Sequence, residues 1–149
     1  METIDPVKAA RVWQRVQGAT KPREEGLLAM IAQEWTDAAT YLQLSRQFQG
    51  KESAALRRLY EEEQAHTACL KGIYTLITGT RPTVKATPPA DRDPEVILRR
   101  CYGREMQCLA SYEDRANDKE YGPVFARLAD QEREHCRVIL ELLGNLKKR

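Results

Sequence analysis

The sequence has 149 residues, a length typical of one compact domain that can bury a core without disulfide staples. Charged residues make up 31% of the chain, nearly cancel to a formal net charge of +2, and are interleaved as on solvated helix faces, which argues against a dedicated nucleic-acid binder. Because the start lacks an apolar signal segment and no apolar run could span a membrane, we expect a cytoplasmic protein without membrane attachment.

Glycine and proline divide the chain into five predicted helices. Asp5-Pro6 pairs a capping residue with proline at the first helical position, and predicts a short helix that ends near Gln17, before Gly18. Apolar residues then recur at spacings of three and four, which predicts four longer helices over about 23–49, 51–78, 93–117 and 122–143. Since no alternating β-branched run is long enough for a strand, the fold class is all-α.

The connections predict how the four long helices are arranged. Gly50 separates the first two and residues 119–121 separate the last two, so each pair should form an antiparallel hairpin. A helix of ~27 residues is ~40 Å long, and the polar, proline-rich linker of ~14 residues between the pairs spans roughly 46 Å when extended. One long crossover favours a ferritin-like four-helix bundle over residues 21–149, preceded by a short N-terminal helix in residues 1–20.

The two halves of the predicted bundle repeat one pattern of acids and histidines. Each half has a lone glutamate followed by E-x-x-H on the next helix, and the second copy follows the first by 71, 69 and 69 residues. The residues are Glu34, Glu63 and His66 in the first half, and Glu105, Glu132 and His135 in the second. Residues three apart share a helix face, and each candidate lies near the midpoint of its helix. We therefore expect all six side chains to meet in one layer of the core.

This set of side chains predicts a two-metal site. Four buried carboxylates without compensation would cost several kcal/mol each, and two divalent cations cancel their formal charge. Mixed oxygen and nitrogen ligands without thiolate suit iron or manganese rather than structural zinc. A single E-x-x-H is weak evidence, since it is common on helix surfaces. Here the chain's only two histidines both fall in that motif, at equivalent places of a repeat.

The same residues resemble the rubrerythrin-like branch of the ferritin-like superfamily. The matching segments are QEWTDAATYL, EEEQAH, REMQCLASYE and FARLADQEREH, and the resemblance covers roughly residues 23–146. It implies two iron ions, with Glu63 and Glu132 bridging them. Glu34 and Glu105 would be terminal ligands, and one histidine would bind each metal. It also implies reduction of hydrogen peroxide with electrons from a small redox protein, and a homodimer.

Two features depart from the rubrerythrin pattern. Those enzymes usually carry an extra glutamate three residues after the third-helix ligand, and that glutamate takes part in their redox-linked ligand exchange. This sequence has Cys108 at that place. The C-terminal rubredoxin domain is also absent from the sequence, so electrons would come from a separate donor. The alternatives are ferroxidase activity with iron storage or sequestration, a di-manganese or oxygen-activating hydroxylase centre, and a metal-stabilised bundle without turnover.

Three further residues are candidates for a role beside the metals. Tyr41 and Tyr112 each follow a lone glutamate by seven residues, and could bond a glutamate or transfer electrons or protons. Cys108 shares a helix face with Glu105. For all three the plainer reading is an ordinary core residue, and for the four cysteines as a group we favour that reading, because free cysteine behaves as a small buried hydrophobe.

Overall fold

The protein is a bundle of four helices, as expected from the sequence. The computed structural model describes residues 6–148, and within the first helix it describes the side chains of residues 6, 7 and 26–45. The helices are α1 (Pro6–Ser45), α2 (Gly50–Thr78), α3 (Pro94–Arg115) and α4 (Gly122–Lys147). Strands are absent from the described part of the chain. The predicted all-α class is confirmed.

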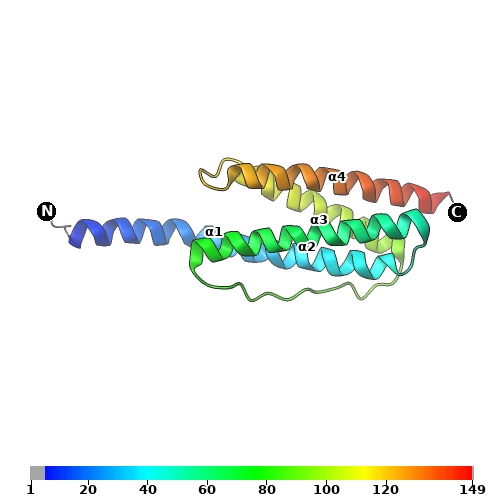
Figure 1. Ribbon diagram of the computed structural model, residues 1–149, viewed down its shortest axis with the longest axis horizontal. Coiled ribbons are helices and arrows are strands. Elements are labelled where there is room, and N and C mark those ends of the chain that lie inside the picture. The colour runs from blue at the N-terminus through cyan, green and yellow to red at the C-terminus, as the bar shows by residue number, and fades with distance from the viewer. Residues whose placement is uncertain (1–5, 149) are drawn as a thin grey trace.

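The helices pair as two antiparallel hairpins joined by one long crossover. α1 packs mainly on α2 and α3 mainly on α4, while α1–α3 and α2–α4 contacts between the hairpins are far fewer. The crossover after α2 runs along the outside of the bundle from one end to the other (Figure 1). Midway it is held to α1, where the Thr87 N–H donates to Thr36 Oγ1 at 3.0 Å. Every helix is therefore antiparallel to the neighbours it touches.

Local sequence signals account for most helix ends. Asp93 caps α3, since its Oδ1 accepts from the Glu95 N–H at 3.0 Å, and proline follows at the first helical position. Gly79 ends α2 in the left-handed conformation with φ of 75°. A Cβ on Gly122 would lie 2.5 Å from the Ala116 carbonyl oxygen, so the tight α3–α4 connection requires glycine there.

The predicted break between a short N-terminal helix and the first long helix is wrong. Gly18 and Pro22 both lie inside the 40-residue helix α1, whose N-terminal part extends beyond the other three helices (Figure 1). Glycine costs about 1 kcal/mol in a helix interior and proline about 3 kcal/mol, so each weakens a helix without having to end it. The predicted cap Asp5 lies outside the described residues, and a domain boundary at residue 20 stays a prediction.

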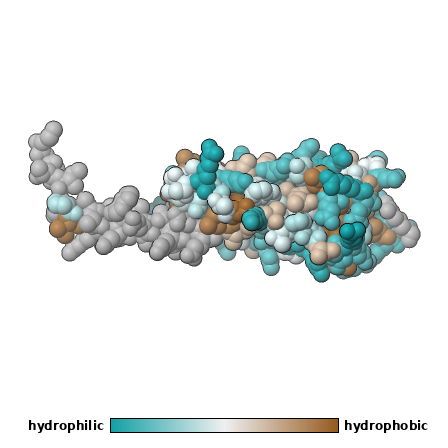
Figure 2. Space-filling view, turned by 90° about the horizontal axis from the view of Figure 1, so that it is seen from below, coloured by the Kyte–Doolittle hydropathy of each residue, from teal (hydrophilic) through white to brown (hydrophobic). Residues whose placement is uncertain are grey.

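Two apolar clusters fill the bundle, one toward each end. The first contains Leu27, Ile31, Leu70, Phe125 and Leu128, and the second contains Leu44, Leu56, Leu98, Ile139 and Leu142. The crossover adds Val84 to the first cluster. The face that carries the crossover is mostly hydrophilic with hydrophobic spots between (Figure 2). None of the helices in residues 6–148 combines the length and apolarity needed to cross a bilayer.

Candidate metal centre

The six predicted ligands form one buried polar layer between the two apolar clusters. None is more than 2% exposed: Glu34, Glu63, His66, Glu105, Glu132 and His135. Five of them lie near the middle of their helix, and Glu34 lies in the C-terminal half of α1, the part that packs against the other helices. The antiparallel packing of α2, α3, α4 and the C-terminal half of α1 brings these six side chains to one height in the bundle. The bundle thus places four carboxylates and two imidazoles where an uncompensated charge is most costly.

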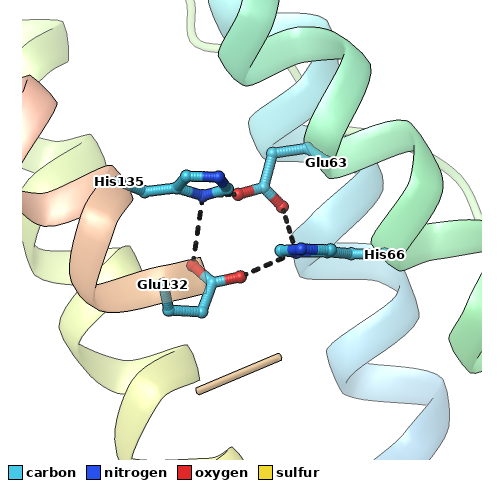
Figure 3. Close-up of side chains that lie close together, drawn as sticks. All are labelled: Glu63, His66, Glu132 and His135. Atoms are coloured by element: carbon cyan, nitrogen blue, oxygen red, sulfur yellow. Dashed lines mark hydrogen bonds and ion pairs between the residues drawn. The ribbon is translucent and has the colours of Figure 1, made fainter. Parts of the chain in front are cut away.

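Glu63 and Glu132 lie between the two histidines and contact both. His66 Nδ1 lies 2.9 Å from Glu132 Oε1 and 3.6 Å from Glu63 Oε2. His135 Nδ1 lies 2.7 Å from Glu63 Oε1 and 3.6 Å from Glu132 Oε2. The imidazole rings are nearly parallel, with centroids 5.4 Å apart, so carboxylates and imidazoles alternate around a small closed circuit (Figure 3). Each of these carboxylates offers one oxygen to each histidine.

Glu34 and Glu105 flank this circuit and contact one histidine each. Glu34 Oε2 lies 3.0 Å from His66 Nδ1, and Glu105 Oε2 lies 3.5 Å from His135 Nδ1. Both histidines therefore turn Nδ1 toward three carboxylates, of which two are shared and one is their own. Two shared and two unshared carboxylates make the arrangement expected around a pair of ions.

Several buried ligand atoms lack hydrogen-bond partners among the described residues. They are Glu34 Oε1, both oxygens of Glu63, Glu105 Oε2, Glu132 Oε2 and His135 Nδ1. Glu63 Oε1 and His135 Nδ1 are only 2.7 Å apart, yet they are not aligned as a hydrogen bond. Buried polar atoms are normally paired, so unpaired lone pairs converging on one point suggest cations as the partners. The donor set fits a di-metal site, and oxygen with imidazole nitrogen suits iron or manganese.

When metal is not bound, protons held by Glu63 and the two histidines balance the negative charge of the buried carboxylates. Burial, followed by the charges of Glu34 and Glu132, raises the pKa of Glu63 well above its usual value. Burial lowers the pKa of His66, but its contacts with Glu132 and Glu34 outweigh this and raise it to about 9. The pKa of His135 is raised as well, again against burial, by contacts with Glu132 and Glu62. Metal ions would displace these protons, since only neutral imidazole and ionised carboxylate coordinate.

One solved structure has the same arrangement of helices over most of the chain. It is the Chlorobium tepidum ferritin, which aligns with a TM-score of 0.66 over 85% of each chain at 21% sequence identity. The chain has a ferritin-like fold. A scan against protein-family models finds no match, and neither does a search of curated proteins. Within the ferritin-like fold, the rubrerythrin-like branch stays a prediction.

The two tyrosines approach glutamates of the opposite hairpin in this ferritin-like bundle. The Tyr41 hydroxyl on α1 donates to Glu105 Oε1 on α3 at 2.6 Å. Tyr112 on α3 is the equivalent residue in the second half. The pKa of its phenol is raised well above its usual value, mainly by burial and next by the charge of Glu34 on α1. Its hydroxyl makes no hydrogen bond of acceptable geometry with the described residues. Of the two tyrosines, Tyr41 alone holds a candidate ligand through a hydrogen bond of good geometry.

Replacing Tyr41 with phenylalanine should destabilise the metal-free protein by about 1–3 kcal/mol, because a buried carboxylate oxygen loses its donor. The Tyr112→Phe variant is the matched control, and should lose less than about 1 kcal/mol, since its hydroxyl has no bond to lose. Urea denaturation of the three proteins measures both values. Equal losses in the two variants would contradict a special role for the Tyr41–Glu105 bond.

The cysteines are free thiols placed mainly in the core. Cys101, Cys108 and Cys136 are buried, and Cys69 is half-buried. Burial raises the pKa of Cys101 to about 12 and that of Cys136 to about 11, and it also raises the pKa of Cys108. These buried thiols stay protonated at neutral pH and are poor nucleophiles, which agrees with the plainer reading of them as packing residues.

Four residues beside the layer did not stand out in the sequence. Arg104 Nε donates to Asp37 Oδ1 at 2.5 Å, which pairs a fully buried acid with a partly exposed base. Glu62 and Gln131 hold the outer nitrogens of the two histidines. The repeat could have indicated Glu62 and Gln131, because each directly precedes the glutamate of an E-x-x-H motif and the two are 69 residues apart.

Proposed function

We propose that this protein is a non-haem di-iron oxidoreductase that reduces hydrogen peroxide, or oxygen, with electrons from a separate donor protein. The observation that carries this proposal is the pair of buried carboxylates, Glu63 and Glu132, which each reach both histidines. A site for one ion needs no such sharing. The resemblance to rubrerythrins suggests peroxide as the oxidant.

The residues of the chain would divide the work as follows. Glu63 and Glu132 would each hold both metals, while Glu34 with His66 and Glu105 with His135 would each hold one. Bound there, a pair of irons would supply the two electrons that convert one peroxide and two protons to two waters. Tyr41 would keep Glu105 in place through its hydrogen bond. The apolar clusters on both sides would exclude bulk water from the layer.

Two surface cavities come close to this layer and suggest how a small oxidant reaches it. One of about 290 Å³ lies between α2 and α4, and its lining includes Glu62 and His135. Another of about 440 Å³ lies between α1 and α3, and its lining includes Met30 and Cys108. Cys108 would then act as a small neutral wall residue between that cavity and Glu34, rather than as a thiolate.

Ferroxidase activity with iron storage is the second candidate, suggested by the likeness to the Chlorobium tepidum ferritin. It would use the same ligands, but storage of a mineral needs a hollow oligomer. Sedimentation of the iron-loaded protein separates the two, since a homodimer, which we propose by resemblance to rubrerythrins, cannot enclose a core.

The test is anaerobic loading with ferrous iron, followed by peroxide and an artificial electron donor. We expect repeated, iron-dependent turnover of peroxide that exceeds the oxidation of added ferrous iron by oxygen. Protein without iron is the first control, and a Glu63→Ala variant is the second. Iron-loaded protein that consumes no peroxide would reject the peroxidase proposal, and faster turnover of ferrous iron with oxygen would favour the ferroxidase.

A further inference from the structure

The two histidines are held from outside by residues of different charge. His66 Nε2 lies 2.7 Å from Gln131 Oε1, and His135 Nε2 lies 2.7 Å from Glu62 Oε2. In both cases Nε2 donates its proton outward, which leaves Nδ1 to face the carboxylate layer. The two contacts are equal in length and equivalent in the repeat. Their acceptors differ, since one is a neutral amide and the other a carboxylate.

Each contact also crosses between the hairpins. Glu62 on α2 holds the histidine of α4, and Gln131 on α4 holds the histidine of α2. A carboxylate that accepts the outer N–H draws the proton toward itself and makes Nδ1 a stronger electron donor to a metal. A neutral amide orients the ring equally well but adds no charge.

We propose that the two metal positions are inequivalent, with the His135 position binding a divalent ion first and more tightly than the His66 position because Glu62 lies behind His135. This inference rests on the proposed di-metal site and deepens it. The more electron-rich His135 position also favours the ferric state, so iron there gives up an electron more readily than iron at His66.

The other charges near the two histidines do not cancel this difference. Arg58 contacts the second oxygen of Glu62 at 3.2 Å, but its side chain is 78% exposed, and such a solvated pair contributes little. Asp37 adds an acid on the Glu34 side, where the Arg104 guanidinium contacts it at 2.5 Å and offsets its charge. The inner carboxylates are matched, with one unshared and two shared for each histidine. The outer partner is therefore the main asymmetry.

Anaerobic calorimetric titration of the metal-free protein with ferrous iron alone tests the proposal. We expect two binding steps whose dissociation constants differ by about tenfold or more, the usual effect of an outer partner on metal affinity. In Glu62→Gln, the first step should weaken by about tenfold, so that the two steps merge. In Gln131→Glu, the second step should tighten by about tenfold. His135→Ala should lose the tight step, and His66→Ala the weak one.

Arg58→Gln is the matched control, because it removes the exposed partner of Glu62 and leaves the contact with His135 in place. It should keep both binding steps. Two equal steps in the natural protein, or an unchanged gap in both Glu62→Gln and Gln131→Glu, would overturn the inequivalence and leave the di-metal site standing. Failure of the natural protein to bind any iron would instead overturn the proposed function and this inference together. Gln131→Glu changes an exposed residue, so it provides a reading even if Glu62→Gln folds poorly.

Discussion

Replacing Glu132 with alanine is expected to empty both metal positions at once, whereas replacing Glu34 or Glu105 is expected to empty only one. The reason lies in the contacts: Glu132 reaches His66 at 2.9 Å and His135 at 3.6 Å. Glu34 and Glu105 contact one histidine each. Iron content after anaerobic loading and desalting, measured by mass spectrometry, should fall from two ions per chain to fewer than one in Glu132→Ala, and to about one in the other two variants.

Glu134→Ala is the control for this series. Glu134 lies on the same helix as Glu132 but is exposed and pairs with Arg137, so this variant should retain two ions. Helical circular dichroism confirms that each variant is folded before loading. The assignment of shared and unshared carboxylates would be refuted if Glu132→Ala kept two ions, or if Glu34→Ala lost both.

The metal-free protein is expected to lose stability as the pH rises from about 5 to about 9. Burial raises the pKa of Asp37 from 3.8 to about 7. The charge of Arg104 lowers this pKa in part, and the charge of Glu34 raises it further. Above about pH 4 the unfolded chain releases this proton while the folded chain keeps it, so folding becomes less favourable until about pH 7. His66 acts in the same direction, because its pKa of about 9 gives stability that is present below pH 6.5 and lost through pH 9.

The expected size of this effect is large for one domain. For Asp37 alone, a rise from 3.8 to about 7 corresponds to about 4 kcal/mol at about 1.36 kcal/mol per pH unit. That lowers the melting temperature by roughly 10 °C in a chain of this size. Thermal unfolding of metal-free protein at pH 5, 7 and 9 measures it. In iron-loaded protein the trend should flatten or reverse, because metal replaces the protons and binds better as pH rises.

Asp37→Asn separates the contribution of Asp37 from that of the imidazoles. The variant keeps the shape of the side chain but cannot ionise, so its melting temperature should change less between pH 5 and pH 7 than that of the natural protein. The fall in the melting temperature of this variant between pH 7 and pH 9 should remain, because His66 is unchanged. A metal-free protein whose stability is level or rises across this range would show that the buried acids do not store protons as described.

The sequence predicted that the six side chains meet in one buried layer, because the relevant information is local and repeated. The E-x-x-H spacing places Glu63 beside His66 on one helix face, and the equal offsets place Glu132 and His135 the same way. Gly79 ends α2 and Pro94 begins α3, as expected. The length of the crossover, and with it the topology, could therefore be predicted from the residues that end and begin helices.

The features that the sequence did not reveal depend on contacts between hairpins or on weak local costs. The Asp37–Arg104 pair and the Glu62–His135 contact join α1 to α3 and α2 to α4, and helical spacing says nothing of which face meets which neighbour. Gly18 suggested a helix end because glycine often follows one. Its penalty of about 1 kcal/mol is small beside the hydrogen bonds that continuing a helix preserves.

The two hairpins resemble a pair of subunits that happen to share one polypeptide. Each hairpin supplies three of the six side chains of the buried layer. Each also accepts a hydrogen bond from the histidine Nε2 of the other hairpin, through Glu62 or Gln131. The crossover after Gly79 then acts as a tether that keeps the second half at a high effective concentration near the first. If the proposed metal pair is bound, its affinity and the docking of the two halves are linked, so a change that loosens the tether would weaken the binding of both ions at once.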